Sequence, residues 1–132
     1  MTHVAVLLGG WSAEREVSLV SGKAVSKALG NRGYRVTEID VERDVGERLA
    51  ELKPDVVFNA LHGRWGEDGC IQGVLEVLGL PYTHSGVMAS SVAMDKPLAK
   101  RVFETDGIPV PEGVIISRED LYRQEPLPRP FV

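Results

Sequence analysis

The feature that most constrains the fold is an alternation between short apolar runs and longer segments with helical spacing. The run His3 to Leu8 is nearly all apolar and ends at Gly9-Gly10, which is typical of a buried parallel strand that meets a tight turn. Similar short runs follow at 34–39, 55–61 and 80–83. This order predicts an open, mostly parallel α/β sheet in three layers, with helices on both faces and right-handed crossovers.

The segments between these runs have the spacing of amphipathic helices. In the first of them, Gly33 is the expected stop. Its apolar residues recur at intervals of three and four: Val17, Val20, Ala24, Val25, Ala28 and Leu29. Shorter helices are expected at 44–52, where Pro54 ends the helix, at 71–78 and at 87–94.

The pattern changes after Met94, which predicts the opening of a second unit. We expect a helix at 97–105, a rigid proline loop at 106–111 and a strand at 113–116. A helix start capped by Ser117 is expected at 117–120, and an extended proline-rich segment at 126–130. A further strand is expected to begin at 131–132. We therefore expect one α/β domain at 1–95 and the start of another at 96–132, as in a fragment of a longer protein.

Composition excludes several classes of protein. The 43% hydrophobic content is enough for a core, and a net charge of −4 with scattered Lys and Arg argues against nucleic-acid binding. Cys70 is the only cysteine, which excludes an internal disulfide and indicates a reducing, cytoplasmic compartment. No apolar run approaches the ~20 residues of a membrane span, and the first run is too short for a signal peptide.

The loop 62–69 concentrates polar side chains at a strand-to-helix junction, where ligands of open α/β sheets bind. It contains His62, and either Glu67 or Asp68 could fix the tautomer of that ring. The alternative is a histidine that only caps the strand. These three side chains and Cys70 match no known ligand spacing, so no metal site is predicted.

Two further loops are expected at the same edge of the sheet. Gly9-Gly10, followed by Ser12, Glu14 and Ser18, either forms an anion-friendly helix start or is a plain glycine turn with a hydroxyl cap. The loop 83–86 brings Ser85 to the same edge. Farther along, Lys96 and Lys100 share a helix face that is either solvated or contacts phosphate.

A dinucleotide-binding enzyme is a weaker interpretation. Asp40 ends the second apolar run, where an acidic residue would hold a ribose. The residues after Leu8 lack the G-x-G-x-x-G spacing, and Trp11 would crowd a pyrophosphate.

Several motifs in order resemble the N-terminal portion of the D-alanine–D-alanine ligases. They are Leu7-Leu8-Gly9-Gly10, Ser12 to Ser18, Ala60-Leu61-His62-Gly63, Gly66-Glu67-Asp68-Gly69, Gln72-Gly73, Gly79 to Thr83, Ser85-Gly86-Val87 and Met94-Asp95-Lys96. The resemblance implies that 1–95 is a Rossmann-like pre-ATP-grasp domain that binds substrate. It also implies that 96–132 begins an ATP-grasp central domain.

The resemblance further implies an ATP-dependent ligase that joins two D-alanine molecules through a D-alanyl phosphate, for peptidoglycan synthesis. Such enzymes are commonly homodimers. The Mg²⁺ ligands and other catalytic groups of the family have no positions in this chain, so the 132 residues alone are expected to be inactive.

The family motif also implies roles for individual residues. Glu14 would hold the ammonium group of the first D-alanine, Val17 would meet its methyl group, and His62 would orient its carboxylate. Ser85 would also bind substrate, and Glu67 and Ser18 would support the substrate-binding side chains. Lys96 would contact the nucleotide.

Two alternatives stay open at this stage. One is a related ligase that makes D-alanyl-D-lactate or D-alanyl-D-serine, and the other is a non-catalytic α/β ligand-binding module. The chain also departs from its relatives: Trp11 and Trp65 stand where smaller residues are frequent, and His84 is at a variable position.

Overall fold

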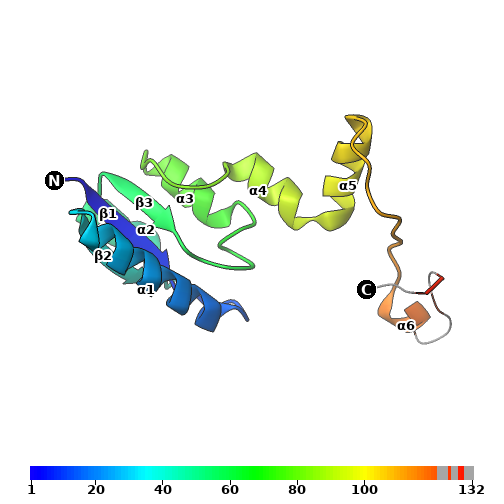
Figure 1. The fold of residues 1–132 in the computed structure, drawn as a ribbon, viewed down its shortest axis with the longest axis horizontal. Helices are drawn as coiled ribbons and strands as arrows, with labels where there is room; N and C mark the ends of the chain where they lie inside the picture. Colours follow the sequence, from blue (N-terminus) through cyan, green and yellow to red (C-terminus); the bar gives the residue numbers. More distant parts are fainter. Residues whose placement is uncertain (122–124, 126–127, 130–132) are drawn as a thin grey trace. The chain divides into compact units, whose positions relative to one another are not determined.

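The computed structural model describes residues 1–121, 125, 128 and 129, and the chain forms two compact units, Met1–Met94 and Asp95–Val132. The first unit contains a sheet of three parallel strands, β1 (His3–Leu8), β2 (Arg35–Asp40) and β3 (Val56–Asn59), in the order β2-β1-β3 (Figure 1). The predicted α/β fold class with a parallel sheet is confirmed.

The central strand β1 is buried along its whole length and contributes to both faces of the sheet. Val4, Val6 and Leu8 belong to an apolar cluster with side chains of α1 (Arg15–Asn31). Ala5 and Leu7 belong to a second cluster, with side chains of α2 (Val45–Leu52) and α3 (Cys70–Val77). Because successive side chains of a strand point to opposite faces, α1 covers one face and α2 and α3 cover the other, in three layers.

The helix α1 packs on the sheet through small residues, which the sequence did not predict. Its buried residues are Ser18, Gly22 and Ser26, whereas Val17 and Val20 are 55% and 71% exposed. A Cβ atom on Gly22 would lie 2.4 Å from Leu8 Cβ, so a larger residue there would separate the helix from β1. The predicted apolar face is therefore wrong for these two valines.

The prediction of a fourth strand at 80–83 is wrong. The segment instead forms a single parallel bridge, between Val57 and Tyr82. The Val57 N–H donates to Pro81 O at 2.8 Å, and the Thr83 N–H donates to Val57 O at 3.1 Å. Pairing stops there because Pro81 has no N–H to donate and His84 has a φ of +79°, which turns the chain out of the extended conformation.

The helices α2 and α3 match their predicted ranges to within one residue, and α4 (Val87–Met94) matches its range at both ends. The helix α1 includes all of the predicted apolar positions and ends before the expected stop at Gly33. The helix α2 ends at Lys53, whose left-handed φ of +48° precedes Pro54. None of the helices in the described part of the chain has the length and hydropathy that crossing a lipid bilayer requires.

The second unit contains α5 (Lys96–Thr105) and α6 (Arg118–Leu121), both close to prediction. The Asp95 carboxylate accepts from the Leu98 N–H at 3.0 Å, and Ser117 Oγ accepts from the Asp120 N–H at 3.1 Å, so both helices begin at a side-chain cap.

The strand expected at 113–116 is wrong, because among the described residues no strand lies beside it to pair with. The predictions for 126–130 and 131–132 fall largely outside the residues that the structure describes.

Candidate functional site

Two loops at the carboxyl ends of β1 and β3 are joined directly. Ser12 Oγ accepts from the Glu14 N–H at 3.1 Å and donates to the His62 carbonyl at 2.8 Å. The Glu14 carboxylate lies against Gly63, where a Cβ atom would be 2.1 Å from Glu14 Oε2. The structure therefore brings the Glu14 carboxylate and the His62 loop to the same edge of the sheet.

The half-buried His62 ring is oriented by α1. Its Nε2 atom lies 3.2 Å from Ser21 Oγ, whereas Glu67 Oε2 accepts the Gly63 N–H at 2.6 Å. Among the described residues, the ring's hydrogen-bond partner is thus Ser21, and Glu67 shapes the loop instead. Ser21 was missed by the sequence interpretation, although it follows Glu14 and Val17 on one helix face by spacing.

Ser18 and Val17 have different surroundings although they are adjacent. The buried Ser18 Oγ donates to Ala60 O at 2.7 Å and so fixes α1 to the end of β3. Val17 is exposed, one turn after Glu14. Neither Ser12 nor Ser18 caps α1, because the N-cap residue is Glu14 and its side chain makes no capping bond.

The loop 83–86 is anchored to the end of β3. The His84 Nε2–H donates to Asn59 O at 2.8 Å, and Thr83 Oγ1 accepts from the Asn59 N–H at 3.1 Å. Ser85 is exposed in this loop, and its carbonyl accepts from Ser90 Oγ at 3.2 Å. In the described part of the chain, no hydrogen bond joins Ser85 to Glu14 or His62.

Asp40 is engaged by Arg15 and therefore does not present a free carboxylate to a ribose. Arg15 Nη1 and Nη2 donate to the two Asp40 oxygens at 2.7 and 2.6 Å, and Nη1 also donates to Gly10 O. This hydrogen-bonded pair lowers the pKa of Asp40, although burial opposes the shift. The contact favours a structural role for Asp40, which the sequence could not reveal.

The loop 62–69 is held by its own backbone and by buried amides. Gly66 O accepts from Asn59 Nδ2 at 2.8 Å and from Gln72 Nε2 at 2.9 Å. The Asp68 carboxylate accepts from the Trp65 and Cys70 N–H groups. Burial alone would raise the pKa of Asp68, but these hydrogen bonds outweigh it and the pKa is lowered. The loop is therefore a fixed platform.

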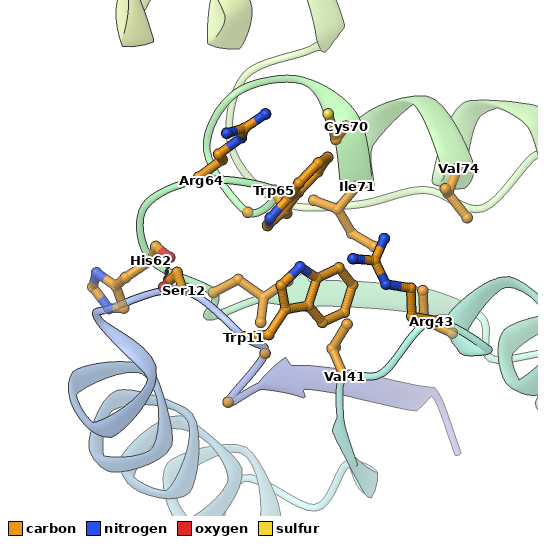
Figure 2. A pocket seen from close by; sticks show the side chains of 15 residues that line it. Trp11, Ser12, Val41, Arg43, His62, Arg64, Trp65, Cys70, Ile71 and Val74 are labelled. Carbon is orange, nitrogen blue, oxygen red and sulfur yellow. Dashed lines mark hydrogen bonds between the residues drawn. The ribbon is translucent and has the colours of Figure 1, made fainter.

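A cavity of about 180 Å³ lies beside this platform (Figure 2). Its lining includes Ser12 and His62, together with Trp11 and Trp65, whose ring centroids are 6.1 Å apart. Glu14, Val17 and Ser85 do not line it. The cavity and the Glu14 carboxylate thus use the same two loops but different side chains.

The described residues include no group of three or more His, Cys, Asp or Glu side chains that could hold a metal ion. Lys96 is exposed in the first turn of α5, in the second unit.

Comparison with known proteins points to one family. A family model for the D-ala D-ala ligase N-terminus matches residues 41–85. The chain is 61% identical, over 130 residues, to a D-alanine–D-alanine ligase of Parvibaculum lavamentivorans and to D-alanine–D-alanine ligase B of Mesorhizobium japonicum. These alignments cover 98% of this chain but only 42% of each relative, so the chain spans less than half of their length.

Solved structures show the same similarity. A Bacillus anthracis D-alanine–D-alanine ligase in complex with ATP superimposes with a TM-score of 0.77 at 29% identity, over 93% of this chain and 44% of that one. The Coxiella burnetii D-alanine–D-alanine ligase gives 0.72 at 31% identity, over 93% and 48%.

Proposed function

Because this chain belongs to the D-alanine–D-alanine ligase family, in which it matches the N-terminal portion, we propose that it provides the binding site for the first D-alanine of an ATP-dependent ligase. The observation that carries the proposal is the meeting of the Glu14 carboxylate with the His62 loop, joined through Ser12.

The proposed reaction joins two D-alanine molecules for peptidoglycan synthesis. The carboxylate of the first attacks the γ-phosphorus of ATP, which forms D-alanyl phosphate and releases ADP. The amine of the second attacks the acyl carbon, the C–O bond to phosphate breaks, and D-alanyl-D-alanine, inorganic phosphate and a proton are released.

Glu14 has the chemistry to bind the ammonium group of the first D-alanine. Its side chain is exposed and, among the described residues, no cation lies within ion-pair distance of it. A carboxylate and an ammonium group form charge-assisted hydrogen bonds, which are stronger than neutral ones. Val17, exposed one turn farther along α1, would contact the methyl group.

His62 would orient the carboxylate that is phosphorylated. Because Nε2 faces Ser21, the other ring nitrogen, Nδ1, has no partner among the described residues and is available to the substrate. The hydrogen bond to Ser21 of α1 fixes the His62 ring, which lowers the entropic cost of aligning the reacting groups. Ser18 and Glu67 would support this arrangement through the bonds to Ala60 O and to the Gly63 N–H.

The remaining roles are proposed from the family motif. Ser85 would contact substrate, and Lys96 would contact the nucleotide from a domain that begins at residue 96, after a substrate-binding domain at 1–95. Mg²⁺ would neutralise phosphate charge during transfer, but the described residues do not fit a metal site, so its ligands would lie elsewhere in the protein. A cytoplasmic homodimer is proposed on the same basis.

The test is D-alanine-dependent ADP release by the intact gene product, comparing wild type with Glu14→Gln. Loss of the charge-assisted contact is expected to lower kcat/KM for D-alanine about tenfold to hundredfold. Glu16→Gln is the matched control, because a residue two positions along a helix lies on a different face and Glu16 is exposed.

Equal activity of wild type and Glu14→Gln would refute the role of Glu14. No D-alanine-dependent ADP release by the wild type would refute the function itself. Offering D-lactate or D-serine as the second substrate in the same assay distinguishes the related ligases.

A further inference from the structure

The cavity beside the loop 62–69 has a composition that the D-alanine site does not explain. Both tryptophans of the chain line it, one from each of the two joined loops (Figure 2). The two indole rings are tilted by 44° at a centroid separation of 6.1 Å. Aliphatic residues complete the apolar part of the wall: Val41, Val45, Leu61, Ile71 and Val74.

The volume of the cavity matches an occupant of about one ring. An apolar cavity of ~150 Å³ in a protein interior accommodates benzene, and this cavity measures about 180 Å³. A single six-membered ring with one small substituent matches that volume. A ring could also extend the aromatic pair, because such rings interact at centroid separations of ~4.5–7 Å.

Two guanidinium groups give the cavity a positive rim. The Cζ atom of Arg43 lies 4.9 Å from the Trp11 ring centroid and 5.8 Å from that of Trp65, and Arg64 Cζ lies 4.5 Å from the Trp65 centroid. Within the described part of the chain, neither arginine forms an ion pair or a hydrogen bond with a carboxylate. Both guanidinium groups are therefore available to pair with a carboxylate ligand.

Each guanidinium keeps donor groups that can bind a ligand while its carbon lies over an indole ring. A guanidinium carries five N–H groups in its plane, and their outward edge is separate from the flat face that can contact an aromatic ring. That edge matches a carboxylate, which accepts two parallel hydrogen bonds. An apolar wall lined by two such groups fits a ligand with a flat apolar ring and one carboxylate.

The position of Trp65 is maintained against backbone strain. Its φ is +74°, a region that bulky residues rarely occupy. The Trp65 N–H donates to Asp68 Oδ2 at 2.9 Å, and its carbonyl accepts from the Ile71 N–H at 3.1 Å. These bonds hold the residue in the conformation that directs its indole into the cavity (Figure 2).

We propose that this cavity is a second ligand site, specific for a single-ring aromatic carboxylate that contacts Trp11 and Trp65 and pairs with Arg43 or Arg64. The site adjoins that of D-alanine, since Ser12 and His62 line it, but Glu14, Val17 and Ser85 do not. The proposal does not depend on ligase activity.

The test measures binding of benzoate to the intact gene product by calorimetry and ligand-detected NMR. Benzamide is the neutral counterpart and lacks the carboxylate that pairs with a guanidinium. Cyclohexanecarboxylate is the non-aromatic counterpart and lacks the ring that contacts the indoles. Each is expected to bind about tenfold more weakly than benzoate. The double variant Arg43→Gln/Arg64→Gln should reduce benzoate affinity about tenfold or more. Arg32→Gln is the matched control, because Arg32 is exposed at the end of α1 and does not line the cavity.

A second variant, Trp65→Gly, removes one indole and also relieves the left-handed strain, which offsets part of the packing that is lost. It too should weaken benzoate binding about tenfold. Absence of benzoate binding at millimolar concentration would overturn the proposal. Binding that survives both sets of substitutions, or that D-alanine displaces, would overturn it as well, because the ligand would then occupy another site.

Discussion

At the scale of single residues, Gly63 determines how closely the Glu14 carboxylate can approach the His62 loop. Its φ is +68°, and an added Cβ would overlap Glu14 Oε2. We therefore expect Gly63→Ala to displace the carboxylate and raise KM for D-alanine about tenfold, measured by ADP release. Backbone strain should add a stability loss of about 1 kcal/mol.

Gly33→Ala is the control for that strain. Gly33 has a φ of +84°, but a Cβ there would meet nothing within 4 Å. The two variants should lose similar stability, and only Gly63→Ala should change KM. A rise in KM for both, or for neither, would contradict this explanation of the glycine.

A second residue-scale prediction concerns His3, which is buried at the start of β1. Its Nε2 lies 2.8 Å from Thr37 Oγ1, and Arg35 Nη2 faces its Nδ1. Burial, followed by the charge of Arg35, lowers the pKa of His3, and Asp55 opposes the shift only in part. The unfolded chain therefore binds this proton more readily than the folded one.

Stability from this source is fully present above the unfolded pKa of ~6.5 and is lost as the pH falls below it. Urea unfolding on both sides of that pH should show the decline in wild type and a flatter profile in His3→Gln. His84→Gln keeps His3 and should keep the decline. An unchanged profile in His3→Gln would show that other groups cause it.

At the scale of elements, a buried hydrogen bond from Ser18 helps to hold α1 to the sheet. The buried hydroxyl of Ser26, on the same helix, provides the control for removing it. Ser18 Oγ donates to Ala60 O at 2.7 Å, whereas Ser26 Oγ is buried without a partner among the described residues. Ser18→Ala leaves a carbonyl unpaired and should cost about 1–3 kcal/mol, measured by chemical denaturation.

Ser26→Ala removes an unsatisfied group and introduces a better helix former. It should be neutral or stabilising by up to about 1 kcal/mol. Equal losses from both substitutions would mean that the Ser18 hydrogen bond contributes nothing specific to stability.

The sequence predicted which elements form better than how they pack. Apolar runs and helix stops located the strands and helices, since those signals are local. The face that α1 buries is set by the close approach of this helix to Leu8. The segment 80–83 does not form a strand because of Pro81 and the left-handed backbone at His84. Neither is visible in periodicity.

The same division holds for the candidate site. The rule that loops after parallel strands meet at one edge predicted that Glu14 and the His62 loop would be neighbours. It could not predict that the His62 ring lies in hydrogen-bond distance of Ser21 Oγ, or that Arg15 donates hydrogen bonds to the Asp40 carboxylate. Both contacts depend on side-chain rotamers and on the rotation of α1 about its axis.

At the scale of the whole molecule, the first unit contains nearly all of the buried apolar side chains. Both apolar clusters lie within residues 4–82, and only Ala99 is a buried hydrophobic residue of the second unit among those described. We therefore expect a chain of residues 1–94 to fold alone. Its melting temperature, measured by circular dichroism, should lie within about 4 °C of that of residues 1–132.

A broad, non-cooperative melt of residues 1–94 would contradict this prediction. It would mean that the second unit contributes to the stability of the sheet.

The central position of β1 has a consequence for biosynthesis. This strand leaves the ribosome before both of its neighbours, which end at Asp40 and Asn59, so its apolar side chains stay unpaired while roughly fifty further residues are translated. We expect chaperones that bind exposed apolar segments to associate with this nascent hexapeptide during that interval. Slowing elongation before β3 emerges should therefore increase co-translational aggregation more than slowing it afterwards.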